Sequence, residues 1–307
     1  MIEFRKQCRD FANKWISIQK KEFQRLGVIG DWDNPYTTMH FHAEAQIVRE
    51  LGKFLKNGGI YKGHRPVLWS VIEKTALADA EVEYHDHKST TIYACFPISK
   101  TDNDKLKEHS IVIWTTTPWT IPGHRALAVH NDIEYKSLNL KINDGNKNII
   151  IASDLVESFI KENKIEEYKV DFSIKGHELT NTFCKHTLYD SGYNFEVPIL
   201  HGDFVTTEQG TGIVHICPVH GMDDFILGKQ HDLELPMTIN ESGIYYDHIP
   251  IFHGQHIFKV DQNVCDEIKK NNNLISQGIL IHSYPHSWRS KAPLVYKNTS
   301  QWFISMD

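Results

Sequence analysis

The sequence predicts an α/β protein in which two N-terminal helices precede a mostly antiparallel, barrel-like β domain with interleaved helices. Apolar residues recur every three or four positions up to residue 26 and again from about residue 39, which is the period of an amphipathic helix. From residue 63 to about 296 the chain changes to short β-rich runs separated by turns. Two further helical patterns interrupt these runs, so helices and strands are mixed in one chain.

The two N-terminal helices have clear ends. The first carries its apolar residues at Phe4, Cys8, Phe11, Trp15 and Ile18. Gly27 follows Leu26 and is a typical helix stop. The apolar face of the second helix consists of Ile47, Val48, Leu51, Phe54 and Leu55. It should begin near Met39 and end at Asn57-Gly58-Gly59.

Short apolar runs mark the expected strands. Ile111-Val112-Ile113 is one, and Asn148 to Ala152 forms another after a turn at Asp144-Gly145. Pro198-Ile199-Leu200 is a third, before His201-Gly202-Asp203. Such runs with polar turns between them favour an antiparallel sheet over a parallel one.

Two helices should interrupt the strands. Ser153 and Asp154 form a good capping pair ahead of the apolar residues of the first, Leu155, Val156, Phe159 and Ile160. The second covers about Val264 to Lys270, and Asn271-Asn272-Asn273 then makes a turn.

The stretch from Trp114 to Pro122 reads Trp-Thr-Thr-Thr-Pro-Trp-Thr-Ile-Pro and is unusual for a core or a linker. The apolar strand before it ends where Pro118 and Pro122 forbid both a central strand and a regular helix. The hydroxyls of the threonines are therefore held on a stiff turn, where they can bind a sugar or a water.

A second motif runs from Gly210 to Asp224. Its sequence is Gly-Thr-Gly-Ile-Val-His-Ile-Cys-Pro-Val-His-Gly-Met-Asp-Asp. It predicts a glycine turn, a short strand, a break at Pro218, and a helix that opens with two carboxylates. Cys217 lies near two histidines but is interpreted as a small packed thiol.

Composition limits the class of protein. The chain is 40% hydrophobic and 23% charged, and no apolar run approaches the roughly 20 residues of a membrane helix. Five scattered cysteines without Cys-x-x-Cys spacing predict reduced thiols and a cytoplasmic location. The net charge of -6 argues against a general RNA binder, although a site for one terminal nucleotide stays compatible with it.

The two motifs together resemble the editing insertion of isoleucyl-tRNA synthetases, called connective peptide 1. The resemblance covers nearly the whole chain, because three further segments match in the family's order. These are Gly30 to Met39, then Lys62 to Trp69 with Ala76 to Tyr84, and finally His282 to Arg289 with Gln301 to Met306. The resemblance implies that residues 1–62 are a helical flank of the Rossmann-type synthetic domain, 63–298 the editing insertion, and 299–307 a strand returning to that domain.

The implied function is post-transfer editing, the hydrolysis of valine from tRNA specific for isoleucine. This family is the standard example of why editing is needed. Isoleucine and valine differ by one methylene, so the binding of the amino acid prefers isoleucine over valine by only about 150-fold. Neither a His-x-Gly-His nor a Lys-Met-Ser-Lys-Ser signature is present, so the chain is expected to be a ligase fragment that does not activate amino acids. Pre-transfer editing of valyl adenylate stays open, and so does a degenerate insertion that only positions tRNA.

The resemblance also implies roles for single residues. Thr115, Thr116 and Thr117 would hold the ribose hydroxyls and the attacking water, and Asp224 would bind the α-ammonium group of the amino acid. The substrate-binding candidates are Trp114, His124, His215, His220 and Asp223. His215 would block isoleucine, and His124 stands where the family usually has Asn. For Asp223, a favourable charge at the helix start is the preferred interpretation.

No cofactor is expected for editing. ATP and magnesium would serve only the synthetic site of the full-length enzyme. Many family members bind a structural zinc through two Cys-x-x-Cys pairs, but here those positions are Ser70, Glu73, Ser287 and Ser290. We therefore predict no zinc and expect packing to hold these segments together. The expected partners are the 3′ end of isoleucine tRNA, the valine moiety and the rest of the synthetase, with no membrane. A metal hydrolase that uses His215, His220 and an aspartate is the weaker reading.

Overall fold

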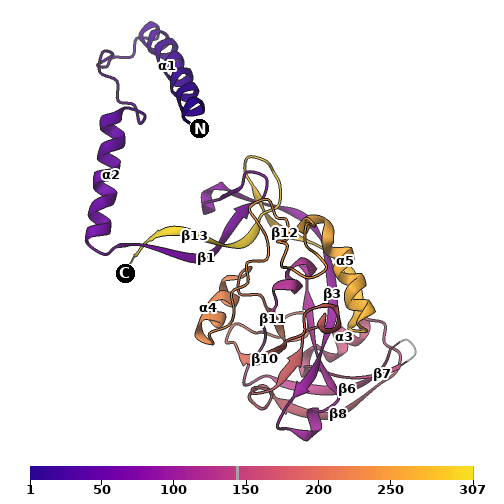
Figure 1. Ribbon diagram of the computed structural model, residues 1–307. Coiled ribbons are helices and arrows are strands. Elements are labelled where there is room, and N and C mark those ends of the chain that lie inside the picture. Colours follow the sequence, from indigo (N-terminus) through magenta and orange to yellow (C-terminus); the bar gives the residue numbers. More distant parts are fainter. Residues whose placement is uncertain (143–144, 307) are drawn as a thin grey trace. The chain divides into compact units, whose positions relative to one another are not determined.

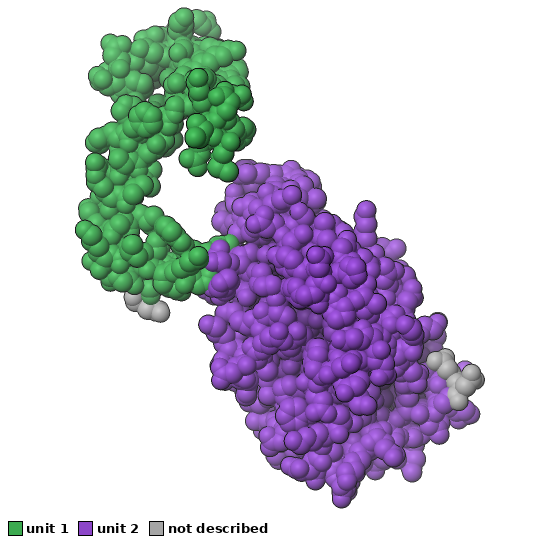
Figure 2. Space-filling view, viewed as in Figure 1, with its two compact units in different colours: residues 1–63, 301–307 green, residues 64–300 purple. Residues whose placement is uncertain are grey.

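The computed structural model describes residues 1–142 and 145–306 (Figure 1). Asp144, part of a predicted turn, and Asp307 lie outside the described residues. The chain divides into two compact units, of residues 1–63 with 301–307 and of residues 64–300 (Figure 2). Each unit is described here by itself.

The smaller unit contains the two predicted helices, α1 (Ile2–Arg25) and α2 (Phe41–Lys56). Gly27 follows α1 with a φ of 81°, and Gly58 follows α2 with a φ of 74°, so glycines end both helices as predicted. Neither helix has a buried residue. No helix within the described residues is long and apolar enough to span a membrane.

The strands form two sheets. The first has three strands in the order β13-β1-β2, which are β1 (Ile60–Ser70), β2 (Thr75–Ala76) and β13 (Val295–Ile304). The second follows the path β11-β5-β10-β9-β3-β4-β7-β6-β8, and β12 pairs with β3 off this path. Its strands are β3 (Val82–Lys100), β4 (His109–Thr115), β5 (Ala126–Val129), β6 (Glu134–Ile142), β7 (Gly145–Ala152), β8 (Tyr168–Lys175), β9 (Phe183–Lys185), β10 (Glu196–His201), β11 (Val214–Ile216) and β12 (Leu274–Ser287).

The large sheet is mostly antiparallel, as predicted. Among the described pairings within it, only β10 with β5 and β4 with β7 are parallel. Three α-helices accompany the strands: α3 (Val156–Glu162), α4 (Met222–Gln230) and α5 (Ile257–Lys270). The mixed α/β class is thus confirmed. The remaining helical turns are the 3₁₀ segments η1 (Asp79–Glu81), η2 (Asp104–Leu106), η3 (Pro118–Gly123), η4 (Ser153–Leu155), η5 (Gly176–Glu178) and η6 (Tyr189–Ser191).

One long ribbon departs from the short strands that the sequence predicts. β3 has 19 residues and β12 has 14, and they pair from Val82 opposite Ser287 to Ala94 opposite Leu274. The first half of β3 is mostly polar and alternates between exposed and half-buried positions, while residues 91–96 are buried. A continuous apolar run therefore marks only half of the strand.

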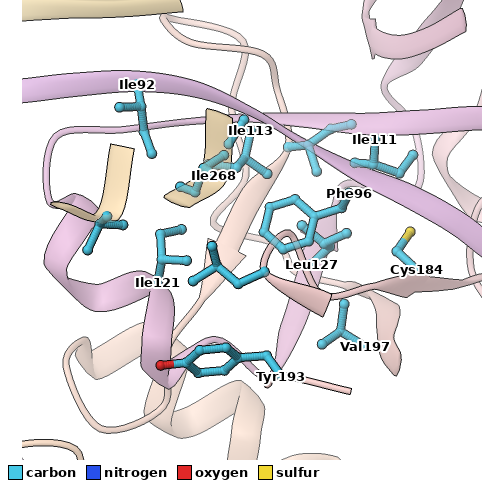
Figure 3. Close-up of a cluster of buried hydrophobic side chains, with 14 of the residues drawn as sticks. Ile92, Phe96, Ile111, Ile113, Ile121, Leu127, Cys184, Tyr193, Val197 and Ile268 are labelled. Carbon is cyan, nitrogen blue, oxygen red and sulfur yellow. The ribbon is translucent and has the colours of Figure 1, made fainter. Parts of the chain in front are cut away.

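The larger unit has its core against the buried half of β3. Ile92 and Phe96 from β3 lie with Ile111 and Ile113 from β4, and Ile268 closes the cluster from α5 (Figure 3). Further labelled members come from β5, β9 and β10. Because this cluster has no exposed apolar surface, it fixes the strands on which the later site is built.

The predicted helix cap at Ser153 and Asp154 is wrong. The helix is present, but both residues lie in η4, and the N-cap of α3 is Leu155, with no capping side-chain bond. Ser153 instead donates its hydroxyl to Glu134 at 3.0 Å, and Thr207 donates to Asp154 at 3.5 Å. Tertiary partners thus replace the local cap.

Gly176 tests the packing of this unit. A Cβ at this position would lie 2.0 Å from the carbonyl oxygen of His130, so a side chain requires backbone movement. We expect Gly176→Ala to lower the free energy of unfolding by about 2–3 kcal/mol in urea titrations. Gly145→Ala is the control, because its Cβ would meet nothing within 4 Å. Equal losses in both variants would contradict the prediction.

Candidate active site

The threonine turn begins where β4 ends at Thr115. The next residues cannot extend the strand, because Pro118 starts η3 and Pro122 lies within it. All of η3 is buried. Its carbonyl oxygens are held from outside, since Tyr245 donates its hydroxyl to Trp119 and His186 donates Nε2–H to Ile121 at 3.1 Å. The turn is therefore rigid, as the two prolines predict.

Hydroxyl groups connect this turn to the second motif. Thr115 Oγ1 lies 3.3 Å from Thr117 Oγ1, which lies 3.5 Å from Thr120 Oγ1. Thr120 donates to the carbonyl oxygen of Thr117 at 2.9 Å, so its oxygen accepts from Nε2 of His215 at 3.0 Å. His215 is thereby assigned as the Nε2–H tautomer, and burial lowers its pKa to about 4. This neutral ring is fixed in orientation.

The second motif folds as the sequence predicts. Gly210 and Gly212 have φ values of 79° and 68°, which only glycine adopts readily. A Cβ on Gly212 would lie 2.4 Å from the Cβ of Ala152, so close packing also requires glycine there. The strand β11 follows, Pro218 comes after it, and α4 begins with Asp223 and Asp224 in its first turn.

Asp224 is the carboxylate of this site. Its Oδ2 accepts the backbone N–H of Cys217 at 2.7 Å. Burial raises the pKa of Asp224 to about 7, the Cys217 N–H opposes this rise, and the charge of Asp223 adds to it. A Cβ on Gly221 would lie 2.8 Å from the carboxyl carbon of Asp224, so Gly221 leaves space for this carboxylate.

The two motifs border one cavity of about 260 Å³. It is lined by Trp114, Thr115, Thr116, Thr117, Thr120, Val214, His215, Cys217, His220, Gly221 and Asp224. Seven of the sequence-predicted site residues thus lie around one space, and Asp223 and His124 do not line it. The sequence analysis missed Thr120, although its place three residues after Thr117 in the threonine-rich stretch is a usable signal.

His220 is held on both sides of its ring. Its Nδ1 donates to the carbonyl oxygen of Tyr296 at 2.7 Å, so Nε2 accepts the Thr238 hydroxyl at 2.6 Å. Burial lowers the pKa of His220 to about 4. The ring therefore forms a neutral wall of the cavity, with no free nitrogen that could take a proton from water.

His124 lies outside the cavity lining and is fully buried. Its ring is 4.5 Å from that of Phe96, 5.5 Å from that of His215 and 5.6 Å from that of His186, measured between centroids. Burial lowers its pKa well below the ordinary range, and both ring nitrogens lack a hydrogen-bond partner. In this position His124 supports His215 by packing and does not reach into the cavity.

Asp223 is exposed at the start of α4. This position agrees with the interpretation of its charge as a helix-start charge, because the N-terminus of a helix favours a carboxylate. Asp223 affects the cavity electrostatically, because its charge contributes to the raised pKa of Asp224.

Neither a thiol nucleophile nor a metal is supported by these residues. Burial raises the pKa of Cys217, so its thiol is protonated at neutral pH. Among residues 1–142 and 145–306, no group of three or more histidine, cysteine or acidic side chains could hold a metal ion. At the positions where the family resemblance implies zinc ligands, three serines and one glutamate do not fit, because a structural zinc site needs thiolate or imidazole ligands.

Comparison with known proteins gives concordant matches. The family model of tRNA synthetases class I (I, L, M and V) matches residues 1–307. The isoleucine–tRNA ligase of Pelagibacter ubique (strain HTCC1062) is 53% identical over 310 residues, which are 100% of this chain and 34% of the relative. That of Gluconobacter oxydans (strain 621H) is 45% identical over 328 residues, again 100% of this chain and 34% of the relative. The chain thus spans about a third of the length of these relatives.

A solved structure, the crystal structure of GlLeuRS-CP1, is also similar. It is 16% identical in sequence, with a TM-score of 0.47. The similarity covers 62% of this chain and 99% of that chain.

Thr120 tests the hydroxyl chain. We expect Thr120→Val to lower the free energy of unfolding by about 1–3 kcal/mol, because the buried Nε2–H of His215 loses its acceptor. Urea unfolding followed by tryptophan fluorescence measures this loss. Thr116→Val is the control, since Thr116 is half-buried and has no described hydrogen bond from its hydroxyl. A loss in the Thr120 variant no larger than in this control would contradict the assigned contact.

Proposed function

We propose, from the premise that this chain belongs to the class I tRNA synthetase family (I, L, M and V), that its larger unit hydrolyses valine from mischarged isoleucine tRNA. One observation carries the proposal. The Asp224 carboxylate shares a cavity of about 260 Å³ with the hydroxyls of the threonine turn. A carboxylate can bind an ammonium group, and hydroxyls can hold a ribose and a water, so this lining supports the proposal.

Asp224 would distinguish a charged tRNA from an uncharged one. An aminoacyl ester carries a free α-ammonium group, and the free tRNA end has no such cation. The carboxylate has one described hydrogen bond, from the Cys217 N–H, and its pKa near 7 reflects a poorly solvated charge. An arriving ammonium group would supply the missing counter-charge and favour the ionised form.

The hydrolysis needs no covalent intermediate on the protein. A water oxygen bonds to the ester carbonyl carbon, the bond to the ribose oxygen breaks, and the ribose oxygen takes a proton as valine leaves. Thr115, Thr116 and Thr117 would orient this water and the ribose hydroxyls. The pKa values of His215 and His220, both lowered to about 4, support an oriented water over a histidine base.

Discrimination against isoleucine would come from the cavity wall. His215 has its ring fixed by Thr120 on one side and by His124 on the other. A rigid wall excludes an added methylene more strongly than a mobile one, because it cannot move aside. The cognate isoleucyl ester would thus be spared.

The smaller unit fits a role within a longer ligase. The relatives are about three times as long as this chain, and α1 and α2 have no buried residue. We propose that the exposed apolar sides of these helices pack against the rest of such a ligase. Amino-acid activation with ATP and magnesium would take place there.

The first test is replacement of Asp224. We expect Asp224→Asn to slow release of valine from valyl-tRNA specific for isoleucine by roughly 100-fold or more, because the ammonium group loses its counter-charge. Release of labelled amino acid at fixed low salt measures the rate. Asp223→Asn is the matched control, and its exposed carboxylate should matter less than about threefold.

Two results would redirect the assignment. Equal slowing in the Asp223 and Asp224 variants would remove Asp224 from its special role. Intact valyl and isoleucyl esters with the unaltered chain, bound to the tRNA end, would favour an insertion that only positions tRNA.

The pH dependence gives a second test. The pKa of Asp224 is raised to about 7, so its carboxyl group is neutral below that pH and cannot pair with an ammonium group. We expect kcat/KM for valine release to fall tenfold per pH unit below about pH 6.5. The acidic limb should disappear in Asp224→Asn. Its persistence there would assign the limb to another group.

A further inference from the structure

Two turns on the strands that enter and leave the larger unit have the same form. Ser70 and Glu73 are three residues apart at the end of β1, and Ser287 and Ser290 are three apart at the end of β12. In the first turn the N–H of Lys74 donates to the Ser70 carbonyl at 2.8 Å, and in the second that of Lys291 donates to the Ser287 carbonyl at 2.9 Å.

Both turns also end in the left-handed region. Lys74 has a φ of 56° and Lys291 a φ of 59°, a conformation that side chains other than glycine rarely adopt. The two turns are thus structurally equivalent, although they lie more than 200 residues apart in the chain. Their shared spacing is that of the Cys-x-x-Cys turns that hold structural zinc.

One carboxylate occupies the point where these turns meet. Glu73 Oε1 accepts the Ser287 hydroxyl at 3.0 Å and the Ser290 N–H at 3.0 Å. Glu73 Oε2 accepts the Ser70 hydroxyl. Ser70 and Ser287 are fully buried, and each hydroxyl oxygen also accepts a backbone N–H, from Glu73 at 3.1 Å and from Arg289 at 3.2 Å. Every polar atom of this arrangement therefore has a partner.

We propose that the Glu73 carboxylate replaces a structural metal ion as the clasp between the two turns. A zinc clasp surrounds one cation with four anionic ligands, whereas this clasp surrounds one anion with hydrogen-bond donors. The sequence analysis expected packing to hold these two segments together. The proposal instead assigns this role to the hydrogen bonds of Glu73. The inference does not depend on the proposed hydrolysis, because it concerns stability and not the cavity.

The clasp depends on the ionised form of Glu73, because the carboxylate accepts its hydrogen bonds. Burial alone would raise the pKa of Glu73, but the hydrogen bonds from Ser290 and Ser287 outweigh burial and lower it. A carboxyl group whose folded pKa lies below its unfolded value stabilises the fold above the unfolded pKa. That stabilisation is lost as the pH falls through the folded pKa.

The first experiment removes the charge and keeps the shape. We expect Glu73→Gln to lower the Tm at pH 7 by about 4–8 °C, because an amide group cannot accept from all these donors. The difference from the unaltered chain should shrink as the pH falls through the lowered pKa of Glu73, because the carboxyl group then takes up a proton. Chelator should leave the Tm of the unaltered chain unchanged.

Glu83→Gln is the matched control. Glu83, near the start of β3, also bonds to the second turn, through Lys291 at 2.7 Å, but its ion pair is exposed. Exposed pairs contribute little, so the Tm should change by less than about 2 °C. A Glu73 variant no less stable than this control, or a chelator-sensitive unaltered chain, would overturn the proposal.

The second experiment tests the equivalence of the turns even if the Glu73 variant unfolds. The fourfold variant Ser70→Cys, Glu73→Cys, Ser287→Cys, Ser290→Cys should bind one Co²⁺ per chain with the absorption of a tetrahedral thiolate site, and Zn²⁺ should displace it. A variant that keeps Ser290 should bind more weakly by at least about tenfold. Absence of this Co²⁺ spectrum in the folded fourfold variant would overturn the shared geometry.

Discussion

The pairing of β3 with its neighbours is the constraint on which the rest of the larger unit depends. β3 pairs with β12 from Val82 to Ala94, with β4 from Ile92 to Pro97, and with β9 at Ile98 and Lys100. Because Ile92 lies opposite Thr115 in this register, β3 determines where the threonine turn begins. The pairing with β12 brings the two ends of the unit together, so the turns at Glu73 and Ser287 meet. A one-residue slip would reverse the faces of both strands.

The cavity is built to be electrically neutral. Burial lowers the pKa values of His215 and His220 to about 4, and it raises that of Asp224 to about 7. Each shift disfavours a charge in a poorly solvated space. A cationic ligand would be attracted to the Asp224 carboxylate as its counter-charge, whereas a neutral ligand would lack this attraction. If the proposed editing function is correct, selection for an ammonium group would follow from desolvation as much as from hydrogen-bond geometry.

The features that the sequence predicted correctly are those that depend on the backbone preferences of single residues. The prolines at 118 and 122 and the glycines at 210 and 212 restrict the backbone wherever they occur, so the turns of both motifs were predictable. The polar half of β3 was not, because its pairing with β12 depends on residues nearly 200 positions away. His124 was a substrate-binding candidate, yet aromatic neighbours bury it outside the cavity lining and its ring nitrogens have no partner. Such environments are set by tertiary packing, to which residue type is only a weak guide.

Three partly buried carboxylates differ in their hydrogen bonds and in the direction of their pKa shifts. Glu73 has donors for both oxygens, and its pKa is lowered despite burial. Asp224 has one described hydrogen bond, and its pKa is raised to about 7. At Asp261, burial raises the pKa to about 6 although Thr90 and Trp119 hydrogen-bond to the carboxyl group, whose Oδ1 lacks a partner. A cationic ligand adds little stabilisation to a carboxylate whose oxygens already accept hydrogen bonds. It stabilises a carboxylate with few hydrogen bonds more strongly. Burial is thus the first cause of the raised pKa values of Asp224 and Asp261, whereas at Glu73 the hydrogen bonds from Ser290 and Ser287 outweigh burial.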